Sequence, residues 1–287
     1  MPEMPEVETI RRDLREKICD QKIAAVQILE PKIVQNCADE FRENLVGNFF
    51  VEIWRRGKLL IFELRKPKKF LLAHLKMTGQ FFWRGHGEFF GGGHGEKFFE
   101  KSTRAIFKFK NSSELFFADA RKFGFLRIVD EKNLQKILAN FGAEILNCGA
   151  EKFSRELNFR DFQKILRPKK NVKSFLLDQK FLAGIGNIYA DEILFAAGVS
   201  PFLKIENLSK KAVRKIFDAA KKILKSAVKN RGTTFNSFRD TRGKIGNFQK
   251  FLQIYGRAKK KCRRCAAILQ KTKIAGRGTT FCANCQK

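Results

Sequence analysis

The sequence lacks any apolar run that approaches the roughly 20 residues of a membrane-spanning helix, which excludes a protein that spans a membrane through helices. Its first eight residues carry three glutamates and no apolar stretch, so they do not fit a secretory signal peptide. No internal repeat is present. We therefore expect a cytosolic location.

Acidic residues are also scarce. The 287 residues include 29 Asp and Glu against 59 Lys and Arg, which gives a formal net charge of +30 and a pI of about 10.1. Folding gains nothing from such an excess, because like charges repel one another. We therefore expect a polyanionic partner, although charge alone does not distinguish DNA, RNA and anionic lipid. Apolar residues make up 44% of the chain, which is enough for a sizeable core.

Cysteines are few and unevenly placed. Three of the seven, Cys19, Cys37 and Cys148, are scattered, and disulfides rarely persist in the cytosol. The other four form two Cys-x2-Cys pairs separated by 16 residues: Cys262, Cys265, Cys282 and Cys285. Two-residue gaps let paired thiolates bend back onto one ion, and four soft ligands complete a tetrahedral zinc site. Because the protein fills every position, the predicted zinc is structural rather than catalytic.

Basic residues lie between these two pairs. Lys271, Lys273 and Arg277 would project from a β-hairpin, where they could reach the phosphates or a groove of a nucleic acid. A zinc ribbon alone is also consistent with protein contacts, so the hairpin does not identify the partner.

The first 130 residues combine one helix with short β-rich runs. Pro5 lies in the opening turn of a predicted amphipathic helix, whose apolar face carries Val7, Ile10, Leu14 and Ile18. Strand patterns follow, separated by turn-like pieces, at residues 23–29, 49–54, 59–64, 70–74, 105–110 and 115–118. This order predicts a β-sandwich domain preceded by a helix.

Helical spacing replaces the strand pattern after about residue 131. The predicted helices cover residues 134–141, 159–166, 172–177, 188–197 and 210–228. Residues 231–250 have few periodic apolar positions, which indicates a long loop. The tail from Cys262 is too short to form a core of its own, so its folding requires the zinc.

The N-terminus offers a nucleophile. Removal of Met1 would expose the secondary amine of Pro2, and an α-amino group has an ordinary pKa of about 7.7–8.0, so part of it is unprotonated near neutrality. Such an amine can attack a sugar C1′ and form a Schiff base. Glu3 and Glu6 would supply nearby carboxylates for proton transfer. On these residues alone, a plain helix start explains the same pattern.

A series of motifs in the same order along the whole chain resembles those of formamidopyrimidine-DNA glycosylases, which excise oxidised purines such as 8-oxoguanine. The opening PEMPEVETI resembles the mature start of these enzymes. The remaining motifs are RRGK at 55–58, HLKMTG at 74–79, DARKFG at 119–124, AGIGNIYADE at 183–192, and QIYGR at 253–257 followed by the four cysteines.

The resemblance implies catalytic roles for individual residues. Pro2 would attack C1′ of the damaged nucleotide, with Glu3 and Glu6 as the carboxylates for proton transfer. Lys58 would assist β-elimination and Arg277 would assist δ-elimination.

The resemblance also implies DNA contacts. Met77 and Phe123 would fill the space left by an extruded base, and Arg121 would hydrogen-bond the orphaned partner base. Lys58, Lys169, Lys173 and Arg277 would bind phosphates, and Asn187 would do so together with the N-terminal amides of its helix.

Two segments depart from the family pattern, and a third resembles a mobile loop of the family. The family commonly carries a DNA-contacting histidine just before the strand that leads to the DARKFG motif, and Ser102 stands there. The glycine-rich residues 85–95, with His86 and His94, are peculiar to this chain, and we interpret them as a flexible surface loop rather than a metal site. Residues 231–250 resemble the family's loop that closes on the damaged base.

We therefore predict an α+β fold: an N-terminal helix and β-sandwich catalytic domain at 2–130, a helix–two-turn–helix domain at 131–245, and a zinc-ribbon β-hairpin at 246–287. The predicted protein is a monomeric base-excision repair glycosylase and AP lyase of the bacterial cytosol or nucleoid. It acts on double-stranded damaged DNA and uses one structural Zn²⁺ and no diffusible cofactor.

Two alternatives remain open. An endonuclease VIII-like enzyme would use the same machinery on oxidised pyrimidines. A zinc-dependent protein could also bind damaged DNA without catalysis. The opening PEMPEV and the pair Arg121 and Phe123 favour the purine enzyme, and Pro2, Glu3 and Lys58 favour an enzyme over a binder.

Overall fold

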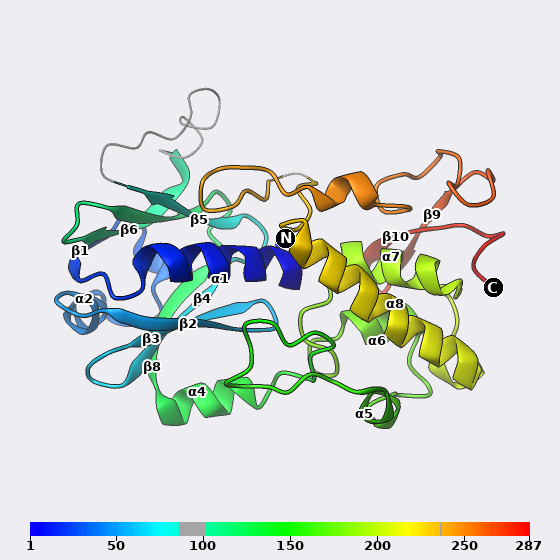
Figure 1. The fold of residues 1–287 in the computed structure, drawn as a ribbon, viewed down its shortest axis with the longest axis horizontal. Helices are drawn as coiled ribbons and strands as arrows, with labels where there is room; N and C mark the ends of the chain where they lie inside the picture. The colour runs from blue at the N-terminus through cyan, green and yellow to red at the C-terminus, as the bar shows by residue number, and fades with distance from the viewer. Residues whose placement is uncertain (86–100, 236) are drawn as a thin grey trace. The chain divides into compact units, whose positions relative to one another are not determined.

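The computed structural model describes residues 1–85, 101–235 and 237–287, which form two compact units (Figure 1). Unit 1 consists of Met1–Ala139 and Arg231–Asn247, and unit 2 of Asn140–Asn230 and Phe248–Lys287. This division differs from the three predicted domains, because the zinc-finger residues group with the helices and residues 231–247 group with the sandwich. Apart from Gly85, the loop predicted over 85–95 lies outside the described residues, as do His86 and His94.

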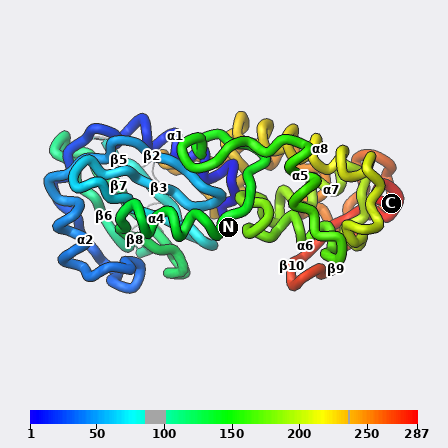
Figure 2. The backbone as a smooth tube through the Cα atoms, turned by 90° about the horizontal axis from the view of Figure 1, so that it is seen from below, coloured from blue at the N-terminus to red at the C-terminus, as the bar shows by residue number. Residues whose placement is uncertain are grey.

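Unit 1 is built on two antiparallel sheets, which Figures 1 and 2 show from two directions. One sheet has the order β1-β6-β7-β5, formed by Ile23–Ile28, Thr103–Phe109, Glu114–Asp119 and Gly79–Arg84. The other has the order β2-β3-β4-β8, formed by Phe50–Arg56, Leu59–Leu64, Lys69–His74 and Phe125–Asp130. The six predicted strands are confirmed. The sequence analysis missed β5 and β8, each of which follows directly on a family motif.

Phenylalanines fill the space between the two sheets. Phe62 of β3 lies 5.2 Å from Phe50 of β2 and 5.8 Å from Phe81 of β5, measured between ring centroids. Phe81 continues the chain of rings to Phe117 of β7 at 5.1 Å, and Phe50 continues it to Phe107 of β6 at 6.4 Å. Tilted and edge-to-face rings at such distances attract one another beyond the burial of their area. The aromatic contacts therefore join one sheet to the other.

The predicted N-terminal helix is confirmed as α1, Met4–Ile18. It begins with a reciprocal capping box between Glu3 and Glu6 and has Pro5 in its first turn, where a missing N–H costs nothing. Its apolar face, Val7, Ile10, Leu14 and Ile18, is fully buried in the core of unit 1. Unit 1 also contains a 3-10 turn at Pro31–Ile33 and the helices α2, Ala38–Leu45, and α4, Glu131–Leu138; α2 was not predicted.

Unit 2 surrounds the helix α7, Asn187–Ala197, nine of whose 11 residues are buried. It packs against α6, Val172–Leu177, against α8, Lys210–Lys229, and against strand β10, Arg277–Phe281. The rest of unit 2 consists of α5, Phe159–Lys164, the 3-10 turns Ile205–Asn207 and Phe248–Phe251, and strand β9, Gln270–Ile274, which pairs with β10. Gly198 ends α7 in the left-handed conformation with φ of +70°. No helix among the described residues is long and apolar enough to cross a membrane.

Replacing Phe62 by alanine tests the aromatic contact between the sheets. We expect Phe62→Ala to lower the free energy of unfolding by about 3–5 kcal/mol, since a buried aromatic side chain leaves a cavity. The only two tryptophans, Trp54 and Trp83, both lie in unit 1, so urea unfolding followed by their fluorescence measures this unit. Phe123→Ala is the control, because Phe123 is 53% exposed and its loss should change the value by less than about 0.5 kcal/mol. Equal effects of the two substitutions would contradict the assignment.

Candidate active site and nucleic-acid interface

The α-amino group of Met1 lies just before α1, within a group of charged side chains of unit 1. Pro2 and Glu3 are buried. Burial is the main cause that lowers the pKa of the α-amino group below its ordinary value of 8.0; the carboxylates of Glu3 and Glu6 oppose this change, and the cations Lys58 and Arg121 add to it. Four residues selected from the sequence thus act on one amine.

The carboxylate of Glu6 binds backbone groups. One oxygen accepts the N–H of Glu3 at 2.7 Å, and the other accepts the N–H of Thr233 at 2.7 Å. A Cβ added at Gly232 would lie 2.7 Å from this carboxylate, so only glycine fits beside it. Glu6 therefore fastens residues 231–247 to the first turn of α1. These contacts point to a positioning role and differ from the proton transfer expected from the sequence.

Lys58 lies in the tight turn between β2 and β3, next to Gly57, which has φ of +58°. The fully buried Arg55 donates to the Gly57 carbonyl at 2.9 Å, and its Nε lies 3.6 Å from Glu8 on α1. Burial by itself would raise the pKa of Glu8, but the hydrogen bond and charge of Arg11, together with the charge of Arg55, hold that pKa below its usual value. The Glu8 carboxylate thus connects the helix that follows Pro2 to the turn that carries Lys58.

His74, to which the sequence analysis gave no role of its own, lies beside this group. It is the last residue of β4 and the cross-strand partner of Leu59, the neighbour of Lys58. Its Nδ1 accepts the N–H of Lys76 at 2.9 Å. Burial, with the charges of Lys76 and Lys58, lowers the pKa of His74 to about 3. The imidazole is therefore neutral at pH 7 with its proton on Nε2, which makes it a hydrogen-bond donor. The sequence did not show that His74 lies near Lys58, because only the strand register pairs His74 with Leu59.

Two loops at one end of the sheets carry the predicted wedge residues. We call residues 75–78 the first wedge loop and residues 120–124 the second. Met77 is half-buried in the first loop. Arg121 and Phe123 are exposed in the second, with the guanidinium carbon 4.7 Å from the ring centroid. Lys122 between them has φ of +56°, a left-handed conformation that turns the chain sharply.

In unit 2, two turns join α6 to α7. The side chain of Gln179 donates to two backbone carbonyls at 2.8 and 2.9 Å and accepts the N–H of Gly184 at 2.9 Å. Gly184 has φ of +100°, which favours glycine. These bonds set the start of α7, where Asn187 is the first residue and donates to the carbonyl of Gly278 at 2.9 Å.

Lys173 is fully buried, in contrast to the phosphate contact expected from the sequence. Its Nζ lies 2.7 Å from the carboxylate of Asp191, and it donates to Thr279 Oγ1 at 2.7 Å and to the Gly278 carbonyl at 3.0 Å. An ammonium group has three donors, and these acceptors satisfy all three. In unit 2, Lys173 therefore links α6 and α7 to the hairpin strand that begins with Arg277. Sequence patterns do not distinguish such a buried lysine from a surface one.

The zinc finger is anchored on α7 as well. Asp191 accepts the N–H of Thr280 at 3.0 Å. Glu192 accepts the N–H groups of residues 253–255 at 2.8–3.0 Å, although burial raises the pKa of its carboxyl. Both ends of the finger thus hydrogen-bond to two adjacent acidic residues of one buried helix.

The four finger cysteines come together at one point. Their Sγ atoms all lie within 4.8 Å of one another, with 3.9 Å between Cys262 and Cys285 and 3.4 Å between Cys265 and Cys282. Thiolates about 2.3 Å from a tetrahedral zinc ion lie about 3.8 Å apart. The donor set and its spacing therefore fit Zn²⁺ with no position open for a substrate. These four residues form a structural zinc site.

The remaining predicted residues have simpler surroundings. Arg277 is exposed at the start of β10, beside the hairpin turn, and Lys169 is exposed between α5 and α6. Ser102, which replaces the family's histidine, is buried directly before β6.

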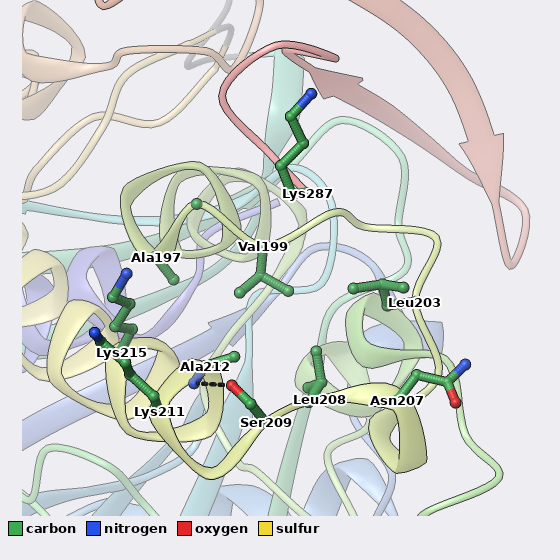
Figure 3. A pocket seen from close by; sticks show the side chains of 11 residues that line it. Ala197, Val199, Leu203, Asn207, Leu208, Ser209, Lys211, Ala212, Lys215 and Lys287 are labelled. Carbon is green, nitrogen blue, oxygen red and sulfur yellow. Dashed lines mark hydrogen bonds between the residues drawn. The ribbon is translucent and has the colours of Figure 1, made fainter.

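Unit 2 also contains a pocket of about 320 Å³ at the end of α7 and the start of α8 (Figure 3). Apolar side chains such as Val199 and Leu203 line it together with the cations Lys211, Lys215 and Lys287. None of the residues predicted to hold zinc or contact DNA lines this pocket. The pocket is therefore not part of the candidate site.

Comparison with known proteins matches three regions of the chain. Residues 1–126 match the formamidopyrimidine-DNA glycosylase N-terminal domain, residues 148–239 its helix–two-turn–helix domain, and residues 259–287 the zinc finger found in these glycosylases and in IleRS.

Individual relatives match over the whole length. A formamidopyrimidine-DNA glycosylase of Desulfitobacterium hafniense is 39% identical over 290 residues, with 100% of both chains covered. The Lactococcus lactis Fpg in complex with DNA containing an abasic site has a TM-score of 0.86 at 32% identity, with 99% of each chain covered. A mutant of the Lactococcus lactis enzyme, in complex with DNA containing Fapy-dG, has the same TM-score of 0.86 and identity of 32%, with 100% of each chain covered.

The two sheets with their N-terminal helix, the helix–two-turn–helix and the four-cysteine finger define a DNA glycosylase that uses a zinc finger. Given full-length relatives at this identity, the chain belongs to the formamidopyrimidine-DNA glycosylase family.

The pKa of His74 predicts a pH dependence of stability. A histidine whose folded pKa lies below its ordinary 6.5 contributes stability above pH 6.5 that is lost as the pH falls from 6.5 toward 3. The free energy of unfolding of unit 1 should therefore fall between pH 7 and 5.5, by at most about 1.4 kcal/mol per pH unit from this residue. His74→Asn keeps an acceptor for the N–H of Lys76 but does not titrate, so urea unfolding should show a flatter dependence. Equal slopes for both proteins would contradict the burial of a neutral imidazole.

Replacing one finger cysteine tests the zinc site. Cys265→Ser should reduce bound zinc from one ion per chain to a small fraction and weaken DNA binding, because metal binding supplies the folding free energy of such fingers. Zinc content and DNA-binding anisotropy measure the two effects. Cys37→Ser is the matched control, since Cys37 is likewise exposed but lies outside the cluster. Full zinc content in Cys265→Ser would rule out the four-cysteine site.

Proposed function

We propose that this chain is a bifunctional DNA glycosylase and AP lyase that removes oxidised purines and attacks the damaged nucleotide with the amine of Pro2. The observation that carries the proposal is the lowered pKa of the Met1 α-amino group directly before Pro2, caused mainly by burial and also by the charges of Lys58 and Arg121. A lowered pKa leaves more of the amine neutral at pH 7, and only the neutral amine is a nucleophile. Removal of Met1 would expose the secondary amine of Pro2, which is buried directly before Glu3, the N-cap of α1.

The chemistry follows from these side chains. The nitrogen of Pro2 attacks C1′, and the bond between C1′ and the damaged base breaks. Glu3, buried next to Pro2, donates a proton to the ring oxygen, so that the deoxyribose opens and an iminium forms between the Pro2 nitrogen and C1′. The iminium draws electrons from the sugar and allows elimination of the 3′ phosphate and then the 5′ phosphate, which cuts the strand on both sides of the lesion.

Other residues hold the participants in place. Lys58 would bind a phosphate and assist β-elimination, held at its turn by Arg55. We infer that His74 donates from Nε2 to DNA near Lys58. Glu6 would act by fixing residues 231–247, which resemble the loop that closes on the damaged base in the family. Arg277 in the finger hairpin would serve δ-elimination, as the family resemblance implies.

The exposed wedge residues fit the need to extrude a base. Unstacking and unpairing a nucleotide costs a few kcal/mol, and apolar side chains that enter the stack offset part of that cost. Met77 and Phe123 have this chemistry, and Arg121 can hydrogen-bond the base left without a partner. Such a substrate is chromosomal DNA, which would place the activity in the bacterial cytoplasm with the nucleoid.

Borohydride trapping tests the proposed nucleophile. Protein verified by mass spectrometry to lack Met1 should form a covalent adduct with a duplex that contains 8-oxoguanine opposite cytosine. Pro2→Gly, and a preparation that retains Met1, should reduce the adduct by at least about 100-fold, since the secondary amine is lost or acylated. Pro5→Ala removes the proline in the first turn of α1 instead and should leave the adduct unchanged.

Other outcomes would redirect the assignment. Adduct formation on thymine glycol but not on 8-oxoguanine would indicate the pyrimidine enzyme. Tight zinc-dependent binding without any adduct would indicate a non-catalytic binder.

A further inference from the structure

The two wedge loops connect the sheets of unit 1 at neighbouring strand ends. The first leads from β4 to β5 and the second from β7 to β8. His74, which ends β4, pairs with Phe125, which begins β8; Gly79, which begins β5, pairs with Asp119, which ends β7. Because both loops start and finish on paired residues, they run beside each other from one sheet to the other.

One carboxylate bonds to both loops. Oδ1 of Asp119 accepts the hydroxyl of Thr78 in the first wedge loop and the N–H of Arg121, at 3.1 Å, in the second. Its Oδ2 accepts the N–H of Gly124 at 2.6 Å. The Thr78 hydroxyl in turn accepts the N–H of Arg121 at 3.1 Å, which closes a ring of three hydrogen bonds.

The surroundings of this carboxylate leave it little freedom. Asp119 is fully buried, and hydrogen bonds to an ionised group gain strength where water is excluded. A Cβ added at Gly124 would lie 2.8 Å from the ring of Phe117 and 3.0 Å from Asp119 Oδ2, so the second loop packs closely over the carboxylate. The neighbouring Arg104 donates to the Asp119 carbonyl at 3.0 Å and fixes the backbone as well.

We propose that Asp119 and Thr78 are positioning residues that lock the two wedge loops into one rigid unit, so that Met77 enters the duplex together with Arg121 and Phe123. The proposal rests on the proposed glycosylase function. Neither residue reaches the reacting atoms. Both act on the insertion that extrudes a base, whereas attack by the amine on an abasic sugar involves no base to extrude. Loss of the lock should therefore slow base excision more than strand cleavage at an abasic site.

Thr78→Val is the discriminating variant. Valine keeps the shape of threonine but removes both the donor to Asp119 and the acceptor for Arg121. We expect single-turnover excision of 8-oxoguanine to fall about tenfold, the effect of roughly one charge-assisted hydrogen bond. β-Elimination at a preformed abasic site should change less than about twofold. Asp119→Asn places an NH2 donor where the Gly124 N–H needs an acceptor. It should therefore slow excision relative to β-elimination even more than Thr78→Val does.

Two further variants serve as controls. Thr78→Ser restores the hydroxyl and should recover excision to within about twofold. Ser113→Ala removes a buried hydroxyl that donates to Asn111 at 2.7 Å, at the opposite end of β7, and should leave the ratio of the two reactions unchanged. Equal losses in excision and β-elimination for Thr78→Val, or no loss in either, would overturn the proposal.

Hydrogen exchange of the protein without DNA gives a readout that does not depend on catalysis. The amides of residues 120–124 should exchange about tenfold faster in Thr78→Val than in the original chain and return to the original rate in Thr78→Ser. An unchanged exchange rate in Thr78→Val would overturn the proposal that the two loops are locked together, even if the protein proves catalytic. If the original chain neither excises nor cleaves, the proposed function fails, while the exchange rates still decide whether the two loops are locked.

Discussion

Hydrogen bonds from backbone N–H groups to buried carboxylates hold the parts of this protein on which its proposed function depends. Glu6 fixes residues 231–247, Asp119 fixes the second wedge loop, and Glu192 fixes residues 253–255 ahead of the zinc finger. A hydrogen bond to a charged group contributes about 1.5–3 kcal/mol, roughly twice the value for a neutral pair. Loops have few apolar contacts of their own, so one well-placed carboxylate can determine the conformation of several residues. Removing it would leave several buried N–H groups without an acceptor.

This use of acidic residues also explains how the charge is distributed. The chain has 29 acidic residues for 59 basic ones, and several of the acidic side chains are buried: Glu3, Glu6, Glu8, Asp119, Asp191 and Glu192. Carboxylates inside the units do little to neutralise the lysines and arginines outside, so the surface is more positive than the composition alone implies. Fewer basic residues are buried among the described ones: Arg55, Arg56, Lys58 and Lys173, the last paired with Asp191. A cationic surface releases counterions when it binds DNA, so affinity depends steeply on salt.

The sequence predicted local features well and long-range contacts poorly. The cysteine spacing and the face of α1 were sufficient for the zinc site and the first helix, because both depend on residues close together in the chain. Strands β5 and β8 were missed because the apolar runs Phe81-Phe82-Trp83 and Phe125-Leu126 follow motifs read as loops. The roles of Lys173 and Glu6 could not be predicted, since their partners Asp191 and Thr233 lie 18 and 227 positions away. Motifs selected the candidate residues, whereas only the fold shows what each one contacts.

The stack of Arg121 on Phe123 places a limit on how the wedge can work. An exposed cation–π pair at 4.7 Å contributes about 0.5–1 kcal/mol and holds both side chains against each other in the free protein. In the proposed function Phe123 stacks on bases and Arg121 faces the orphaned base, so this contact would have to be broken or rearranged. Loops that also had to become ordered at that moment would add a cost of about 1–2 kcal/mol for each backbone residue fixed. Under the proposal, a wedge whose backbone is already fixed by Asp119 would avoid that cost, so that only side chains would rearrange when the base leaves the helix.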